Sequence, residues 1–313
     1  MNKKTITFFM LVTPRDAILA DYSIRSFGKL QSVLQAYDWG LQVYLNCLND
    51  SLKEKYVTRW EKISYVQLID NKNIFNHENI NPGEIVHFQG ISTRPYEGKY
   101  EIGCMVWERE FRKMQSDYWC IVDADFEIIE PDFIIHMLQS LDNDKHLYVY
   151  STDSGVIVEK YNTYSDEDIV SAERYDTWFC MYKKECLQCK TPLYYYEEIR
   201  DGKKWVWDDT GKFQEELKKQ VGCNFMSISQ IEPLSLRNNY IYQYIHYGAF
   251  SKNVTLNTRW KIFWYRIIIL LSHRGFVLLD RKNPINKLTR FFMTKLREYK
   301  YSSLWLERGK YQY

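Results

Sequence analysis

The first 125 residues alternate between short, continuous apolar runs and longer segments with helical periodicity. Residues 5–12, 41–48 and 65–69 are runs of the first kind, and residues 18–34 carry apolar side chains at helical spacing. Apolar runs of this length, separated by helical segments, are typical of parallel strands that helices bury on both faces. The alternation therefore predicts an α/β fold with a mixed, mainly parallel sheet flanked by helices.

The same pattern continues less regularly beyond these residues. Residues 71–99 are rich in Asn, Pro and Gly, which predicts a loop over the sheet. A helix over 100–114 and a strand over 119–122 follow, and Pro131 occupies the favoured first turn of another helix. Shorter strands are predicted at 147–151, 156–158 and 177–182. We expect one continuous domain over about residues 1–255.

Two acidic residues directly follow the apolar run at 118–122, in the sequence Asp123-Ala124-Asp125. In open α/β sheets, ligands bind beyond the carboxyl ends of the strands. Two carboxylates on one turn suit Mn²⁺ or Mg²⁺ bridged to a diphosphate, because the metal neutralises the phosphate charge. In the alternative interpretation Asp123 caps the next segment and Asp125 is simply exposed. The position directly after a buried strand favours the metal site.

This order of elements and its Asp-x-Asp motif resemble the GT-A superfamily of glycosyltransferases, over about residues 3–255. In that superfamily the motif holds a divalent metal on the diphosphate of a nucleotide-sugar. The resemblance implies a nucleotide-binding half over residues 1–125 and an acceptor-binding half over 126–255. It also implies Mn²⁺ or Mg²⁺ as cofactor and a nucleotide-diphosphate sugar, in the first place a UDP-sugar, as co-substrate.

A second motif, from Ile245 to Lys252, is similar to the His-x-x-Gly-x-x-Lys element of glycogenin-like and lipopolysaccharide glycosyltransferases. The resemblance implies that His246 completes the metal shell and that Lys252 contacts the diphosphate. The sequence departs from the pattern, since only one residue separates His246 from Gly248 and no Pro-Trp follows. A buried histidine bonded to backbone is the alternative.

The resemblance also suggests catalytic and nucleotide-binding residues by position. Many GT-A enzymes carry acids where Asp208 and Asp209 follow Trp207, ahead of a helix predicted over residues 213–220. A carboxylate beside an aromatic wall has a raised pKa and can accept the proton of an acceptor hydroxyl. Capping of the helix is the structural alternative. By position, the resemblance implies that five further residues contact the nucleotide, the donor sugar or the phosphates: Thr13, Arg15, Asp70, Arg109 and Lys113.

The charge of the chain is distributed unevenly, although the net charge is only +2. Residues 252–313 hold 14 basic and 3 acidic side chains, and the remaining residues are net acidic. Residues 256–313 are also aromatic, and they predict a basic helical extension. Such helices suit the surface of an anionic membrane, so we expect a cytoplasmic protein that associates peripherally with the inner face of the plasma membrane. Packing of these helices on the core is the alternative.

Several further features of the sequence limit the functions that the chain can have. No apolar run is long enough to span a bilayer. The pair Cys186 and Cys189 is weak evidence for zinc, even with Cys180 and Cys223 nearby. A sugar-phosphate nucleotidyltransferase needs a glycine-rich loop after the first strand, and residues 13–16 contain no glycine. A nucleic-acid-binding protein acting through the basic extension would leave the acids and His246 unexplained. The sequence favours a transferase acting on a glycan or lipid-linked glycan in lipopolysaccharide, O-antigen or capsule assembly, with no nucleic-acid partner.

Overall fold

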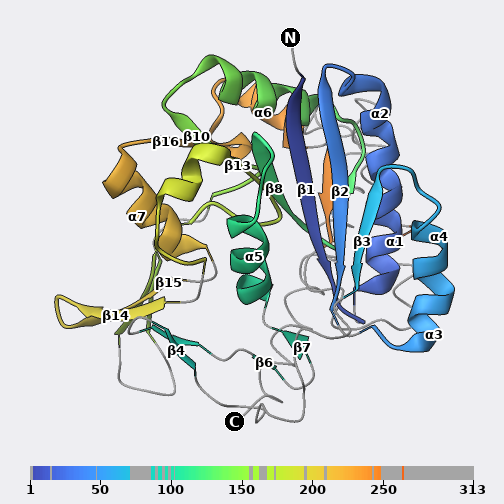
Figure 1. Ribbon diagram of the computed structural model, residues 1–313. Helices are drawn as coiled ribbons and strands as arrows, with labels where there is room; N and C mark the ends of the chain where they lie inside the picture. The colour runs from blue at the N-terminus through green and yellow to red at the C-terminus, as the bar shows by residue number, and fades with distance from the viewer. Residues whose placement is uncertain are drawn as a thin grey trace, which may run out of the picture.

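A seven-stranded mixed sheet forms the centre of the protein in the computed structural model (Figure 1). The structure describes residues 3–14, 16–46, 48–70, 86–88, 91–93, 96–97, 100–101, 103–154, 158–161, 168–172, 174–193, 196–207, 210–241, 243–247 and 263. The strands lie in the order β16-β10-β13-β8-β1-β2-β3. Their bounds are β1 Lys4–Val12, β2 Tyr37–Leu45, β3 Val66–Asp70, β8 Tyr118–Asp123, β10 Leu147–Ser151, β13 Phe179–Lys183 and β16 Asn224–Ser227. Only β13 runs antiparallel to its neighbours, which confirms the mainly parallel α/β fold.

Helices cover both faces of this sheet. Alternate residues of β1 point to opposite sides, so Phe8 and Met10 pack in one apolar cluster and Phe9 in the other. The first cluster includes α1, α2, α4 and α6, and the second includes α5 and α7. The helix bounds are α1 Ala17–Ser26, α2 Leu30–Val33, α3 Asp50–Leu52, α4 Thr58–Trp60, α5 Gly103–Arg112, α6 Asp132–Asn143, α7 Gly211–Val221 and α8 Leu234–Ile241. The result is a three-layer arrangement with the sheet in the middle.

Four smaller sheets complete the described part of the chain. A four-stranded sheet has the order β11-β12-β15-β14, and β9 pairs with β17 in an antiparallel pair. Their bounds are β9 Phe126–Ile128, β11 Val158–Tyr161, β12 Asp168–Ser171, β14 Tyr196–Arg200, β15 Lys203–Trp207 and β17 Tyr244–His246. Asp201 and Gly202 connect β14 to β15 with positive φ angles of 54° and 75°, as the tight turn of a β-hairpin requires.

Two predicted segments differ from the structure. The helix predicted over residues 18–34 is interrupted by a 3-10 turn at Phe27–Lys29, where Gly28 weakens helix formation. The loop predicted over residues 71–99 contains three short strands: β4 Val86–Phe88, β5 Ile91–Thr93 and β6 Tyr96–Glu97. The helix predicted over residues 100–114 begins only at Gly103, as α5, because Tyr100–Glu101 form the strand β7 and pair with β6. In the described residues, local pairing therefore replaces part of the predicted loop and the start of the predicted helix.

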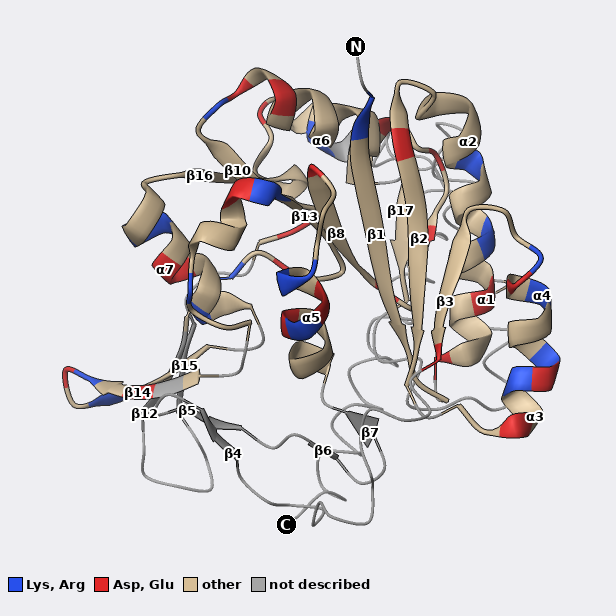
Figure 2. Cartoon of the chain, viewed as in Figure 1, with Lys and Arg blue, Asp and Glu red and all other residues tan. Residues whose placement is uncertain are grey.

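Charged residues lie mainly on the helices and connecting turns, whereas the central strands contain few of them (Figure 2). No helix among the described residues has both the length and the hydropathy needed to cross a membrane. The predicted basic extension lies outside the described residues except for residue 263. Its helical structure and its membrane contact therefore stay predictions.

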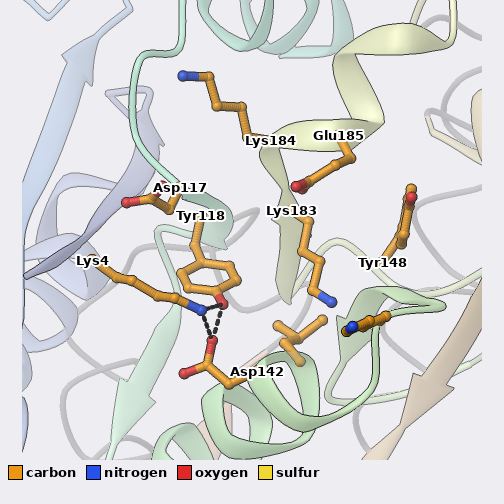
Figure 3. A pocket seen from close by; sticks show the side chains of 10 residues that line it. Lys4, Asp117, Tyr118, Asp142, Tyr148, Lys183, Lys184 and Glu185 are labelled. Atoms are coloured by element: carbon orange, nitrogen blue, oxygen red, sulfur yellow. Dashed lines mark hydrogen bonds and ion pairs between the residues drawn. The ribbon is translucent and has the colours of Figure 1, made fainter.

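The amino-terminal edge of the sheet carries a pocket of about 310 Å³ (Figure 3). Asp142, near the end of α6, lies at the bottom of this pocket in Figure 3. Its carboxylate accepts hydrogen bonds from the hydroxyls of Tyr118 and Tyr37 and forms an ion pair with Lys4. Lys183 donates to the main-chain oxygen of Asp144, the residue directly after α6, at 2.7 Å. The cations of this pocket therefore stabilise the carboxyl end of a helix and one half-buried acid.

Replacement of Asp142 by Asn is expected to lower the free energy of unfolding by about 1–3 kcal/mol at neutral pH. Burial raises the pKa of Asp142, but the bonds from Lys4, Tyr118 and Tyr37 outweigh it and hold the pKa below its ordinary value. A depressed folded pKa stabilises the protein above the unfolded pKa, near 4, and this contribution is lost as the pH falls through the folded value.

Urea denaturation of the wild type and the variant between pH 3 and pH 7 measures this effect. The difference in stability should be largest at neutral pH and should shrink towards pH 3. Asp38→Asn, at an exposed position of β2, is the matched control and should be near neutral throughout. A difference for Asp142→Asn that is the same at every pH would contradict the assignment.

Candidate metal centre

Four parallel strands end at the same edge of the central sheet, opposite the pocket of Figure 3. Leu45 of β2 is in register with Val12 of β1 and with Asp70 of β3, and Asp123 of β8 is opposite Leu11. The chain proceeds from β1 outward to β2 and β3, and β8 then lies on the other side of β1. The strand order thus reverses between β1 and β8, which is where open α/β sheets bind ligands.

The two predicted metal-binding acids lie at this reversal point. Asp123 is the last residue of β8, and its amide donates to the main-chain oxygen of Trp178 at 2.9 Å. Asp125 lies in the turn between β8 and β9 and is 8% exposed. Its main-chain oxygen accepts a hydrogen bond from the amide of Tyr247 at 3.0 Å. Both acids are therefore fixed by main-chain contacts with segments far away in the sequence.

His246 reaches the two acids because β17 pairs with β9. The pairing places His246 opposite Phe126, and the hydroxyl of Tyr247 donates to Glu127 at 2.5 Å, which ties the same two strands together. His246 Nε2 lies 3.4 Å from Asp123 Oδ2 and 3.2 Å from Asp125 Oδ1. Ligand atoms of all three residues lie within 4.8 Å of one another.

Asp123, Asp125 and His246, which we call the metal group, suit a hard divalent cation. Burial lowers the pKa of His246, but the carboxylates of Asp125 and Asp123 outweigh burial and raise it to about 9. Two carboxylates and one imidazole are ligands that Mn²⁺ accepts, and the acids alone suit Mg²⁺. A divalent cation must compete with the proton of His246, so its binding releases that proton and strengthens as the pH rises.

Two of the predicted nucleotide contacts lie at the same edge as the metal group. Thr13 follows β1, and its amide and hydroxyl both donate to Asp16 Oδ2. Asp70 ends β3 and forms an ion pair with Lys53 at 2.9 Å. Neighbouring strands are separated by about 4.8 Å. Asp70 and Asp123, on strands three positions apart, are therefore separated by roughly 14 Å across the edge.

The two predicted contacts on α5 have partners within the protein. Arg109 donates to the hydroxyl of Tyr44 at 2.7 Å and pairs with Glu110 at 3.1 Å. Lys113 follows α5, before β8 begins, and pairs with the same Glu110 at 3.0 Å. Lys113 is thus near the start of the strand whose far end carries Asp123, and the structure does not bring it to the metal group. The predicted residues Arg15, Asp208, Asp209 and Lys252 lie outside the described residues.

One residue that the sequence analysis did not single out contacts two members of the metal group. Trp178 binds the amide of Asp123 through its main-chain oxygen, and its indole ring stacks on His246 with ring centroids 4.2 Å apart. In the sequence, Trp178 looks like the start of an apolar strand. Because β13 pairs antiparallel with β8, the start of β13 lies at the edge where β8 ends. The sequence indicated the strand but not this pairing, so it did not indicate that Trp178 lies beside Asp123.

The cysteines that offered a zinc alternative are buried core residues. Cys180, Cys186, Cys189 and Cys223 all belong to the apolar cluster that α5 and α7 share. Burial raises the pKa of the Cys180 thiol to about 12 and that of Cys223 to about 11. Among the described residues, only Asp123, Asp125 and His246 form a group of three or more with suitable metal-ligand spacing.

Searches of the sequence against protein-family models and against curated proteins find no match. Solved structures with a similar arrangement include a mannosyltransferase from Pyrobaculum calidifontis in complex with GDP-Man and Mn²⁺, at 11% identity, with 97% of this chain and 84% of that chain covered and a TM-score of 0.44. Another is glucosyl-3-phosphoglycerate synthase from Mycobacterium tuberculosis in complex with Mn²⁺ and UDP-glucose, at 10% identity, with coverage of 89% and 81% and a TM-score of 0.40. A third is CMP:2-keto-3-deoxy-manno-octonic acid synthetase complexed with CTP, at 10% identity, with coverage of 72% and 89% and a TM-score of 0.37.

At such identities and TM-scores below 0.5, no neighbour assigns an activity to this chain. The function proposed below therefore rests on the side chains of the metal group and on their place at the sheet edge.

Proposed function

We propose that the protein is a metal-dependent glycosyltransferase that moves a sugar from a nucleotide-diphosphate sugar to a hydroxyl of a glycan acceptor. The observation that carries the proposal is the metal group itself. Asp123, Asp125 and His246 come from two separate parts of the chain and meet where the strand order reverses. Asp125 is buried and Asp123 half-buried, and a bound cation offsets the repulsion between two carboxylates held this close together.

A divalent cation in this group would neutralise the charge that develops on the diphosphate as the bond to the sugar breaks. Asp123 and Asp125 would supply oxygen ligands and His246 a nitrogen ligand. On this proposal Thr13, Arg15 and Asp70 bind the nucleotide along the ends of β1 and β3, and Lys252 contacts the diphosphate. Asp208 or Asp209 takes the proton of the acceptor hydroxyl.

Titration with nucleotide-sugars tests this function directly. Calorimetry with UDP-, GDP-, dTDP- and CMP-sugars, each with and without Mn²⁺, should show metal-dependent binding of at least one diphosphate sugar. CMP-sugars are the internal control, because a single phosphate offers the metal no diphosphate to bridge. Binding that is equally strong after treatment with a chelator would contradict the proposal.

We further propose that the acceptor is lipid-linked and belongs to surface-polysaccharide assembly, with the basic extension at residues 256–313 on the anionic membrane. The net positive charge of that extension supports membrane contact. The full chain should bind vesicles that contain anionic lipid more tightly than neutral vesicles, and salt should weaken this binding. Retention on heparin without any vesicle binding would favour a nucleic-acid-like ligand instead.

A further inference from the structure

Asp176 is a buried carboxylate beside the metal group that the proposed reaction has so far not used. It lies two residues before Trp178, the residue that contacts both Asp123 and His246. Its charge is close enough to these two ligands for each of them to influence its pKa. Asp176 is therefore at the same edge of the sheet as the metal group, on the side of β13.

The main chain around Asp176 is held in place from several directions. The amide of Asp176 donates to the main-chain oxygen of Asp153 at 2.9 Å, and the hydroxyl of Ser151 donates to the main-chain oxygen of Asp176 at 2.6 Å. The preceding residue, Tyr175, exchanges two hydrogen bonds with the side chain of Gln214 on α7, at 2.8 Å and 3.0 Å. The carboxylate thus projects from a segment with little freedom to move.

The carboxylate of Asp176 is only partly compensated. Its exposed fraction is 9%, and its one ion-pair partner among the described residues is Arg174, with Nε 3.4 Å from Oδ1. That distance joins the two charges but is longer than a strong charge-assisted hydrogen bond. Burial raises the pKa of Asp176 to about 6, although Arg174 acts in the opposite direction. Buried polar groups are normally hydrogen-bonded, so this carboxylate has acceptor capacity to offer a ligand.

We propose that Asp176, oriented by Arg174, binds hydroxyl groups of the transferred sugar and selects neutral sugars over acidic ones. The inference rests on the proposed function, because a diphosphate on the metal group brings its sugar to this edge. A carboxylate accepts hydrogen bonds from two neighbouring hydroxyls, whereas it repels a second carboxylate.

The test compares each nucleotide-sugar with its bare nucleotide, so that the sugar contribution is isolated. Dissociation constants are measured with Mn²⁺ for UDP and UDP-glucose and for GDP and GDP-mannose, in the wild type, Asp176→Asn and Asp176→Ala. For the pair that the wild type prefers, the advantage of the nucleotide-sugar over the nucleotide should fall by about 10- to 100-fold in both variants. Binding of the bare nucleotide should stay within about threefold.

A selectivity measurement separates the assignment from a general loss of structure. The preference for UDP-glucose over UDP-glucuronic acid should decrease in Asp176→Asn, since that variant keeps the shape of the side chain and removes its charge. Asp153→Asn removes the same charge from the neighbouring segment and should leave the ratio of nucleotide-sugar to nucleotide affinity unchanged.

Two outcomes would overturn the assignment, and they are distinguishable. An unchanged affinity ratio in both Asp176 variants, with metal-dependent nucleotide binding intact, would remove Asp176 from the sugar site and leave the proposed function standing. If the wild type binds no UDP-, GDP- or dTDP-sugar with Mn²⁺, the proposed function fails and the assignment fails with it.

Discussion

Asp125→Asn is expected to lower metal-dependent turnover by roughly 10³-fold, because the variant replaces a charged ligand with a neutral one. A metal ion contributes several kcal/mol to the stabilisation of a developing negative charge, and each 1.36 kcal/mol corresponds to tenfold in rate. The fold should survive the change. Asn keeps the shape of the Asp125 side chain, and the hydrogen bond between the amide of Tyr247 and the main-chain oxygen of Asp125 does not depend on the side-chain charge. The metal-free variant gives up only the ion pair with His246.

Thermal unfolding gives a readout that does not depend on activity. A ligand that binds only the folded state stabilises it by about 2.7 kcal/mol at 100 times its dissociation constant. Mn²⁺ should therefore raise the melting temperature of the wild type and leave that of Asp125→Asn almost unchanged. Asp132→Asn, at an exposed position in the first turn of α6, is the control and should respond to Mn²⁺ as the wild type does. An Asp125→Asn variant that stays fully active after chelator treatment would show that this group binds no catalytic metal.

The central sheet could be predicted because its signals are local. β1 and β8 are short apolar runs that are largely buried on both faces, and the run of residues 4–12 is visible without knowledge of its neighbours. The acids at the end of β8 were predictable for the same reason, since a strand followed by a turn can be recognised from adjacent residues. The structure confirms the proximity of Asp123, Asp125 and His246.

Contacts between distant segments were not predictable in this way. The pairing of β17 with β9 joins residues about 120 positions apart, and no periodicity in either segment indicates the partner. The roles of Trp178 and Asp176 depend on the antiparallel insertion of β13 between β8 and β10. By contrast, the hairpin of β14 and β15 had a usable signal, because Asp201-Gly202 between two strand-like segments is a strong predictor of a tight turn.

Asp208 and Asp209, the predicted acceptor-facing acids, are flanked by two described residues. Trp207, at the end of β15, and Thr210, before α7, are both buried. A side chain added at Gly211, the first residue of α7, would lie 3.4 Å from Cβ of Arg174, so the start of α7 packs against the segment that carries Asp176. The first turn of α7 therefore lies against the segment that carries Arg174 and Asp176.

If Asp208 or Asp209 is the catalytic base, its replacement by Asn should lower turnover by roughly 10²–10⁴-fold while binding of the donor persists. The prediction is that one of the two variants, Asp208→Asn or Asp209→Asn, shows this loss. The measurement pairs the turnover rate with the dissociation constant of the nucleotide-sugar in the presence of Mn²⁺. Asp201→Asn is the matched control, because it is an exposed acid in the hairpin turn before β15 and Asn tolerates its positive φ.

The pattern of the losses also indicates the stereochemical course. A loss of turnover with unchanged donor affinity identifies a base that deprotonates the acceptor hydroxyl, as inversion at the anomeric carbon requires. Equal losses in turnover and donor affinity place the acid on the donor sugar instead, which favours a retaining enzyme. If both variants keep full turnover, neither residue is the base, and the acceptor proton must leave through another group at this edge of the sheet.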